Sequence, residues 1–307
     1  MLIRLAITAA ILVYLATQID MAEAARAIAA ISRPHLIVVL ALVGVDRAVM
    51  ILRWVLLLRA AGNAITTGAA ARLFLVSSFV GSFLPAGVGG DAARAYGLAR
   101  ANTSSSEAVA SVAVDRLLGI LSLVVMGVIG LLTWTPEGGD ALRLGVAIAL
   151  LAAACVAVFW ADAWLRRLIP AHRHQGFVTR RLLRLTDAVG RYRGHRDVIL
   201  HVFVWSIAVQ VLRITQAYVL GLGLGMTVPF TFFLLFMPLA LLLLLLPISI
   251  SGFGLPQGGI VWMLDPMNVS HSVSFALSTL IVLTGLAGNL PGLFLWLRAR
   301  NPVKSRV

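Results

Sequence analysis

The chain has 307 residues, of which 60% are hydrophobic and only 12% are charged, about half the charged share of an ordinary soluble domain. Its formal net charge of +13 would suit a nucleic-acid-binding protein, but the basic residues gather in one loop and in the tail. That placement is typical of the cytoplasmic segments of membrane proteins. Composition and charge therefore exclude a soluble domain, argue against a nucleic-acid partner and predict a multi-pass membrane protein.

Six apolar segments are candidates to cross the roughly 30 Å hydrocarbon core of a bilayer. In chain order they are residues 3–17, 36–58, 108–134, 142–165, 198–222 and 272–297. The first segment has a short basic start and an apolar core, which is also the pattern of a signal peptide. We expect an uncleaved helix there, because further membrane segments follow and no soluble domain does.

Two further apolar segments, 69–84 and 231–246, each end at a Leu-Pro break. The breaks read Leu84-Pro85-Ala86-Gly87-Val88-Gly89-Gly90 and Leu246-Pro247-Ile248-Ser249-Ile250-Ser251-Gly252. Proline removes a backbone N–H and glycine tolerates strained backbone, so both breaks interrupt a helix. At membrane depth, non-helical backbone is buried in protein or lines a wet cavity. A matched pair of breaks is typical of a transporter's central site, whereas a single break would indicate a plain kink.

The positions of the charges predict the topology. The basic loop 166–196 holds nine arginines and the tail holds four more basic residues, so both are expected in the cytoplasm. Working back from these points, residues 69–100 form a re-entrant hairpin from the inside, and residues 231–264 form one from the outside. The single transmembrane domain, 1–307, then contains two half-repeats, 35–134 and 198–297, with the same plan in opposite orientations.

Apolar residues recur at steps of four and three within the basic loop. They lie on one face of a helix, with arginines off that face: Val178, Leu182, Leu185, Val189 and Tyr192. We expect this amphipathic helix to lie on the cytoplasmic membrane surface or to be a solvated linker.

Charged residues inside apolar spans are expensive and by default indicate a site or a pathway. Asp46, Arg47 and Arg53 lie within the second span, and Arg213 lies within the fifth. Arg53 and Arg213 precede the prolines of the two breaks by 32 and 34 residues, so they occupy corresponding positions in the two halves. Because a planar guanidinium fits phosphate, these two are the first candidates for headgroup ligands, followed by Arg94.

The first break predicts a backbone cradle for that headgroup. Gly87, Gly89 and Gly90 would bring bare backbone close to it, and Asp91 would cap the free N–H groups of the helix that restarts there. Arg94, one turn further on, would be free to meet phosphate. The competing interpretation is a rigid turn with a local salt bridge between Asp91 and Arg94.

Three motifs together resemble the lysylphosphatidylglycerol synthase transmembrane family, also called the flippase-like or UPF0104 family. They are Leu84-Pro85-x-Gly87-x-Gly89-Gly90-Asp91-x-x-Arg94, Asp115-Arg116, and Leu246-Pro247-Ile248-Ser249-Ile250-Ser251-Gly252-Phe253-Gly254. The resemblance covers nearly the whole chain. It implies a membrane domain that, in the bifunctional enzymes of the family, is taken to flip an aminoacylated lipid. Those enzymes also carry a soluble aminoacyl-transferase domain, which this sequence lacks, so we do not expect it to make lysyl-lipid by that route.

Two positions depart from the family pattern. The second motif commonly continues Gly-x-Gly-Val-Arg-Glu, but here Leu255-Pro256-Gln257 follows the second glycine, so an arginine and an acidic residue are missing. The carboxylate before Arg116 is often Glu in the family and is Asp115 here. The missing acidic residue argues against proton or cation coupling through that position.

The sequence contains no His-Glu-x-x-His, Gly-x-Ser-x-Gly or phosphate-loop motif. We therefore predict a lipid translocase, or flippase, that moves an anionic or modified lipid between leaflets of the bacterial cytoplasmic membrane, with the C-terminus in the cytoplasm. One alternative is an integral-membrane lipid-modifying transferase with Asp91 or Asp46 as its base. The other is a non-transporting partner of an envelope-lipid pathway.

The predicted fold is an all-α polytopic bundle of about six spans with two re-entrant hairpins in an inverted repeat. With the single Cys155 excluding a disulfide framework, we expect no cofactor and no metal site. As protein partners we consider a second copy of the chain, in a homo-oligomer, or a separate lipid-synthesising enzyme.

Asp115 and Arg116 fit a structural ion pair as well as a substrate contact. The predicted substrate-binding residues are Arg53, Arg213, Arg94, Asp91, Gly87, Gly89, Gly90, Asp115, Arg116, Pro85, Pro247, Ser249, Ser251, Gly252, Gly254 and Gln257.

Overall fold

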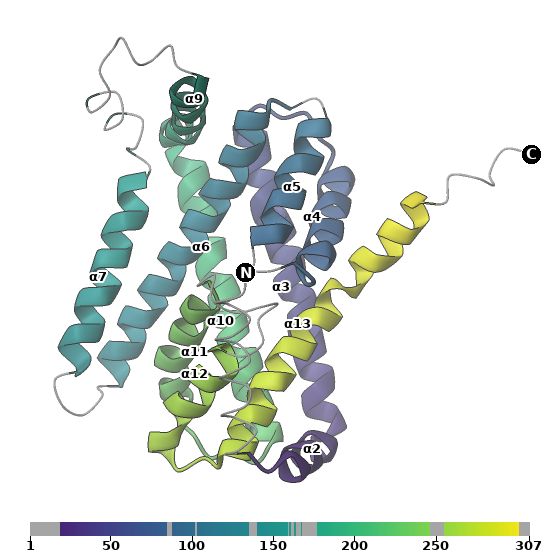
Figure 1. The fold of residues 1–307 in the computed structure, drawn as a ribbon, viewed down its shortest axis with the longest axis vertical. Helices are drawn as coiled ribbons and strands as arrows, with labels where there is room; N and C mark the ends of the chain where they lie inside the picture. Colours follow the sequence, from purple (N-terminus) through teal and green to yellow (C-terminus); the bar gives the residue numbers. More distant parts are fainter. Residues whose placement is uncertain are drawn as a thin grey trace, which may run out of the picture.

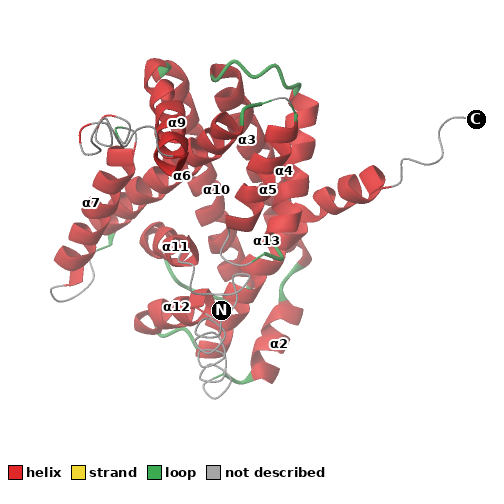
Figure 2. Ribbon diagram, turned by 45° about the horizontal axis from the view of Figure 1, so that its top comes forward, coloured by secondary structure: helices red, strands yellow, loops and turns green. Residues whose placement is uncertain are grey.

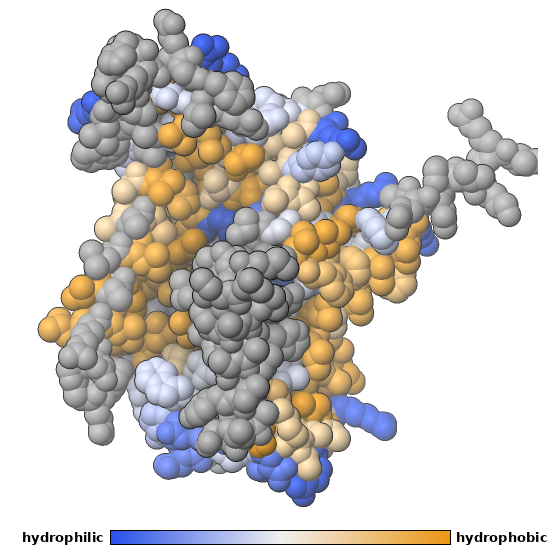
Figure 3. Space-filling model, viewed as in Figure 1, coloured by the Kyte–Doolittle hydropathy of each residue, from blue (hydrophilic) through white to orange (hydrophobic). Residues whose placement is uncertain are grey.

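A computed structural model describes residues 19–84, 88–101, 103–134, 140–158, 160, 163, 167, 177–245 and 255–300. Within these ranges all regular secondary structure is helical, which confirms the all-α prediction (Figure 1, Figure 2). Apolar side chains cover the middle of the face seen in Figure 3, and hydrophilic side chains gather toward both ends. This is the surface expected of a protein whose middle is solvated by lipid.

Four helices of the described part are long and apolar enough to cross a membrane. They are α3 (Arg33–Ala60), α6 (Ser105–Thr133), α10 (Arg196–Gly223) and α13 (His271–Arg300). The shorter α7 (Asp140–Val158) covers the first part of the predicted segment 142–165, and the predicted segment 3–17 lies outside the described residues. The structure thus shows a multi-pass membrane protein in which four of the six predicted spans are long apolar helices.

Local side-chain hydrogen bonds define where several helices begin. Ser104 caps α6 and Thr66 caps α4 (Thr67–Gly81), each accepting a hydrogen bond from the backbone N–H three residues on. Asp20 caps α2 (Met21–Ala30), a short helix that the hydropathy pattern did not predict. The capped N–H groups would otherwise have no partner within the helix.

Two pairs of shorter helices form hairpins that enter the bundle from opposite ends (Figure 1). α4 runs from one end toward the middle, and α5 (Val88–Arg100) returns to that end. α11 (Phe230–Leu245) and α12 (Leu255–Leu264) do the same from the other end. Each hairpin flanks one of the two Leu-Pro breaks. Seven predicted site residues of the breaks lie outside the described residues: Pro85, Gly87, Pro247, Ser249, Ser251, Gly252 and Gly254.

The helices of the two halves have corresponding neighbours. α3 packs against α10, α4 packs against α13, and α11 packs against α6. In addition, α5 lies on α6 and α12 lies on α13. This set of contacts therefore stays the same when each helix is exchanged for its counterpart: α3 for α10, α4 for α11, α5 for α12 and α6 for α13.

The α4–α5 hairpin depends on a close approach of its glycines. A Cβ atom on Gly81 would lie only 2.5 Å from the Cα atom of Gly90, so the two backbones can approach because neither residue has a side chain. Gly89 and Gly90 lie within α5 and have ordinary helical φ values. Gly89 packs against the side chain of Leu84, which fits tight packing better than the predicted cradle, whereas Gly90 lines the cavity described below.

The amphipathic helix predicted in the basic loop is present as α9 (Phe177–Arg191). Val189 of its apolar face and the adjoining Tyr192 are buried against the ends of α3, α6 and α10. The Tyr192 hydroxyl also donates a hydrogen bond to the carbonyl oxygen of Leu57 at 3.4 Å. Leu182 of the same predicted face is 41% exposed, so only the C-terminal part of the face packs against protein, and its placement on the membrane surface stays a prediction.

Candidate functional site

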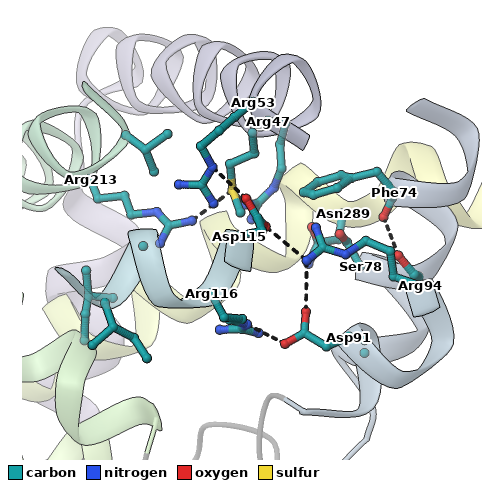
Figure 4. A pocket seen from close by; sticks show the side chains of 18 of the residues that line it. Arg47, Arg53, Phe74, Ser78, Asp91, Arg94, Asp115, Arg116, Arg213 and Asn289 are labelled. Carbon is teal, nitrogen blue, oxygen red and sulfur yellow. Dashed lines mark hydrogen bonds and ion pairs between the residues drawn. The ribbon is translucent and has the colours of Figure 1, made fainter. Parts of the chain in front are cut away.

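A cavity of about 340 Å³ lies between the two halves of the bundle, and α3, α4, α5, α6, α10, α11 and α13 all contribute to its lining (Figure 4). Guanidinium groups inside an apolar bundle need counter-charges within contact distance. Three aspartates, Asp46, Asp91 and Asp115, supply them. The arginines that line the cavity are Arg47, Arg53, Arg94, Arg116 and Arg213.

Asp115 of α6 lies at the most buried point of this charged group. Its Oδ2 accepts a hydrogen bond from Nη2 of Arg94 at 3.0 Å. Its Oδ1 lies 2.8 Å from Nε of Arg53, which is an ion pair without the alignment of a hydrogen bond. The Arg94 guanidinium also lies over the rings of Trp54 and Phe74, with 5.0 and 5.3 Å to the ring centroids. Two buried cations therefore share one buried carboxylate.

Asp91 of α5 extends the group toward the surface. Its Oδ1 lies 3.4 Å from Nη2 of Arg94, and its Oδ2 accepts a hydrogen bond from Nε of Arg116. The Arg116 side chain is 42% exposed, whereas those of Arg94 and Asp115 are 4% and 3% exposed. The ion pairs thus form a continuous chain that begins in the protein interior and ends at an accessible arginine (Figure 4).

Asp46 forms the second centre of negative charge, within α3. Its Oδ2 accepts a hydrogen bond from Nη1 of Arg47 at 3.0 Å, and its Oδ1 accepts one from Nε of Arg213 at 3.0 Å. Arg213 also contacts the sulfur of Met50, and Arg47 donates to the carbonyl oxygen of Gly285 at 3.2 Å. These contacts tie the first span of one half to helices of the other half.

The α3–α10 contact relates the two halves residue by residue. Arg53 donates from Nη1 to the hydroxyl oxygen of Ser206 at 2.9 Å, while Arg213 pairs with Asp46 at 3.0 Å. Asp46 lies seven residues before Arg53, and Ser206 lies seven residues before Arg213. Ser206 therefore occupies in α10 the position that Asp46 occupies in α3. Arg53 contacts Ser206 and Arg213 contacts Asp46, so each arginine contacts the equivalent position of the other half.

The site carries an excess of positive charge and open hydrogen-bond donors. Five arginines and three aspartates leave a formal surplus of two positive charges in and beside the cavity. The Nε atoms of Arg47 and Arg94 are buried and have no hydrogen-bond partner within the described ranges. An unpaired buried donor is costly, so an acceptor oxygen that reached either atom would stabilise it. The arrangement fits an oxyanion such as phosphate.

The structure brings seven of the predicted site residues to this cavity: Arg53, Arg94, Arg213, Asp91, Asp115, Arg116 and Gly90. Several predicted roles differ from the observed contacts. Arg94 is buried in ion pairs, so it is not free in the way we predicted. Asp91 lies in the first turn of α5, and its oxygens bind guanidinium groups where we expected a helix cap. Asp115 and Arg116 were predicted to be structural ion-pair residues or substrate contacts, and both form ion pairs with residues of other helices.

The predicted substrate-binding residues omitted several residues of the site. Arg47, which lines the cavity, and its ion-pair partner Asp46 were visible as charges within a span, but no motif placed them among the substrate-binding residues. Small polar residues gave a weaker signal, because isolated serines and amides are common in membrane helices. The missed lining residues of this second kind are Ser77, Ser78, Ser82, Gln210 and Asn289.

The family assignment agrees with these residues. The sequence model of the family described as "Lysylphosphatidylglycerol synthase TM region" matches residues 1–292. The chain belongs to this family. The resemblance inferred from the two Leu-Pro motifs and the Asp115-Arg116 dipeptide is thereby confirmed over nearly the whole chain. No curated protein matches the sequence. Membership of the lysylphosphatidylglycerol synthase TM region family makes this a membrane domain linked to lipid handling.

The charges in this family member are distributed unequally between the halves. Gln257, at the position where an acidic residue is common, is buried in α12 and is not among the residues that line the cavity. Seven of the eight charged groups come from α3, α5 and α6 of the first half, and Arg213 of α10 is the eighth. The contacts between the halves are symmetric, whereas the charge is concentrated on one side.

Proposed function

We propose that this protein is a lipid translocase that moves an anionic lipid between membrane leaflets, with the phosphate of the headgroup bound by the arginines of the cavity. The observation that carries the proposal is the surplus of two positive charges in a cavity enclosed by apolar helices. Such a surplus is costly in a bilayer unless an anion compensates it. A lipid supplies that anion while its acyl chains stay in the surrounding hydrocarbon.

The arrangement of the helices supports alternating access. We propose that α4–α5 and α11–α12 are re-entrant hairpins from opposite membrane faces, within an inverted repeat of residues 35–134 and 198–297 and about six spans. The exchange-symmetric contacts of these helices support this topology. So does the reciprocal placement of Arg53 and Arg213. In transporters of this plan, movement of one half against the other exposes a central site to each side in turn.

The aspartates of the cavity favour translocation over lipid modification. A transferase would need a carboxylate oxygen that is available to remove a proton from a substrate hydroxyl. Asp46 and Asp91 were the candidates for this base, and each already receives two guanidinium groups. Neither carboxylate therefore presents the open side that such a base requires.

The proposed orientation can be checked by cysteine labelling. We place the end of the bundle that bears α9, and the C-terminus, in the cytoplasm of a bacterial inner membrane, because the basic residues gather there. In a Cys155→Ala background, cysteines at Ser105 and Arg180 are expected to react only with reagent that reaches the cytoplasm. A cysteine at Gly225 is expected to react from outside. Labelling of Ser105 and Gly225 from the same side would exclude this orientation of the halves.

The proposed activity is tested with purified protein in vesicles. Fluorescent phosphatidylglycerol in the inner leaflet should become accessible to an added quencher that does not cross the membrane, at a rate well above that of protein-free vesicles. The lipid recovered afterwards should be chemically unchanged. Chemical conversion of the lipid would indicate a transferase, and a rate equal to that of empty vesicles would contradict translocation of this lipid class.

A further inference from the structure

Gln210 of α10 lines the cavity and has an unused acceptor atom. Its Nε2 donates to the carbonyl oxygen of Gly119 at 3.4 Å and to the hydroxyl oxygen of Ser122 at 3.1 Å. Ser122 in turn donates to Gly119, so its oxygen is an acceptor toward Gln210 and the amide orientation is determined. The Oε1 atom is therefore the remaining polar atom of the side chain, and the residue is 2% exposed. This oxygen has no hydrogen-bond partner within the described part of the chain.

Asn289 of α13 repeats this arrangement on another wall of the cavity. Its Nδ2 donates to the hydroxyl oxygen of Ser82 at 2.9 Å, and Ser82 donates to the carbonyl oxygen of Ser78 at 3.0 Å. This again determines the orientation of the amide. The Oδ1 atom of Asn289 is buried and lacks a hydrogen-bond partner among the described residues. Both side chains line the same cavity as the arginines.

Two residues that line the cavity therefore each carry a buried acceptor without a described partner, and a ligand that supplies donors would pair with both. Buried polar atoms in folded proteins are almost always paired, and an unpaired one costs free energy until a partner arrives. We infer that the cavity takes a phospholipid headgroup that carries neutral hydroxyl groups beside its phosphate, as a glycerol or sugar headgroup does. This inference rests on the proposed function and specifies its substrate class.

The charges of the cavity favour hydroxyl donors over ammonium donors. An ammonium group could also donate to Gln210 and Asn289, but it would enter a cavity that already holds a surplus of two positive charges. It would also need a carboxylate, and the three aspartates of the site are engaged by arginines. Hydroxyl groups donate to the same amide oxygens without adding charge. The cavity should therefore disfavour ethanolamine and aminoacylated headgroups.

The test compares three dihexanoyl lipids that differ only in the headgroup. Phosphatidylglycerol has a phosphodiester and two hydroxyls, phosphatidylmethanol has the same charge and no donor, and phosphatidylethanolamine has an ammonium group. We expect purified full-length protein to bind phosphatidylglycerol about tenfold more tightly than phosphatidylmethanol, which is about 1.4 kcal/mol. Phosphatidylethanolamine should bind more weakly than phosphatidylglycerol. Titration of the tryptophan fluorescence measures all three affinities, since Trp54 contacts the Arg94 guanidinium.

Variants connect the preference to the two amides. In Gln210→Met and in Asn289→Leu, phosphatidylmethanol affinity should remain while the advantage of phosphatidylglycerol falls to less than about threefold. Gln216→Leu is the matched control, because Gln216 lies on the same helix, has a buried unpaired Nε2 and is not among the lining residues. It should keep the wild-type preference. If one amide variant fails to fold, the other variant and the comparison of lipids on the wild-type protein still test the headgroup inference.

Each outcome bears on a different proposal. Equal wild-type affinity for phosphatidylglycerol and phosphatidylmethanol, or tightest binding of phosphatidylethanolamine, would overturn the headgroup inference and leave phosphate binding intact. An undiminished preference in both amide variants would also overturn it. Failure of both anionic lipids to bind would instead contradict the proposed function.

Discussion

Replacing Asp115 with asparagine is expected to lower the melting temperature of the detergent-purified protein by about 10 °C. Asp115 compensates Arg53 and Arg94, and all three side chains are no more than 5% exposed. Removing the shared carboxylate leaves two buried guanidinium groups without their counter-charge, a change that costs about 3–5 kcal/mol for a single buried pair. Thermal unfolding followed by tryptophan fluorescence measures the shift.

Asp91→Asn is the matched control for this effect. Asp91 also contacts two arginines, but its side chain is 20% exposed and its partner Arg116 is 42% exposed, so water can compensate part of the lost interaction. The control should lose less than half as much stability. Adding both Arg94→Met and Arg53→Met to Asp115→Leu should restore most of the melting temperature without restoring translocation, because buried charges that are removed together can be replaced by apolar groups of similar volume. An Asp115→Asn protein that melts with the wild type would show that the carboxylate does not hold the bundle together.

Much of the helical framework could be predicted because hydropathy reports which segments are apolar. The ranges 36–58, 108–134, 198–222 and 272–297 correspond to α3, α6, α10 and α13, whose ends lie within about three residues of the predicted ones. The two Leu-Pro breaks also marked the ends of α4 and α11, since proline and glycine act locally on the backbone. Periodicity predicted α9, but an apolar stripe states only that a face is buried and does not say against what.

The contacts of the site could not be predicted in the same way. A charge within a span indicates a buried partner, yet the partner depends on how neighbouring helices are rotated and shifted. Arg94 was expected to face a ligand, but the orientation of α5 on α6 directs it to Asp115. Arg53 reaches Ser206, 153 residues away in sequence, and no local pattern joins these two. The charge surplus of the cavity follows from such pairings and so appears only in three dimensions.

Arg213→Gln is expected to reduce the rate of lipid translocation at least tenfold while changing the melting temperature little. The substitution reduces the positive surplus of the cavity from two to one, whereas Asp46 keeps its ion pair with Arg47. The Arg213 side chain is 26% exposed, so its loss does not leave a sealed, uncompensated charge. Lysine at this position should recover only a small part of the rate, because it lacks the planar fork that binds two phosphate oxygens. Vesicle translocation and thermal unfolding measured on the same preparation separate the two effects.

Two further variants distinguish a direct phosphate ligand from a contributor of net charge. Arg213→Gln combined with Asp46→Asn returns the surplus to two without restoring the guanidinium, and we expect translocation to remain close to that of Arg213→Gln. The double variant Arg53→Gln with Arg213→Gln removes the surplus altogether and should abolish binding of anionic lipid. Arg59→Gln controls for loss of an arginine from α3, since Arg59 donates to the hydroxyl of Thr67 and is not among the cavity-lining residues. Wild-type translocation by the double glutamine variant would remove both arginines from the mechanism. Full recovery with Asp46→Asn would mean that Arg213 acts through its charge alone.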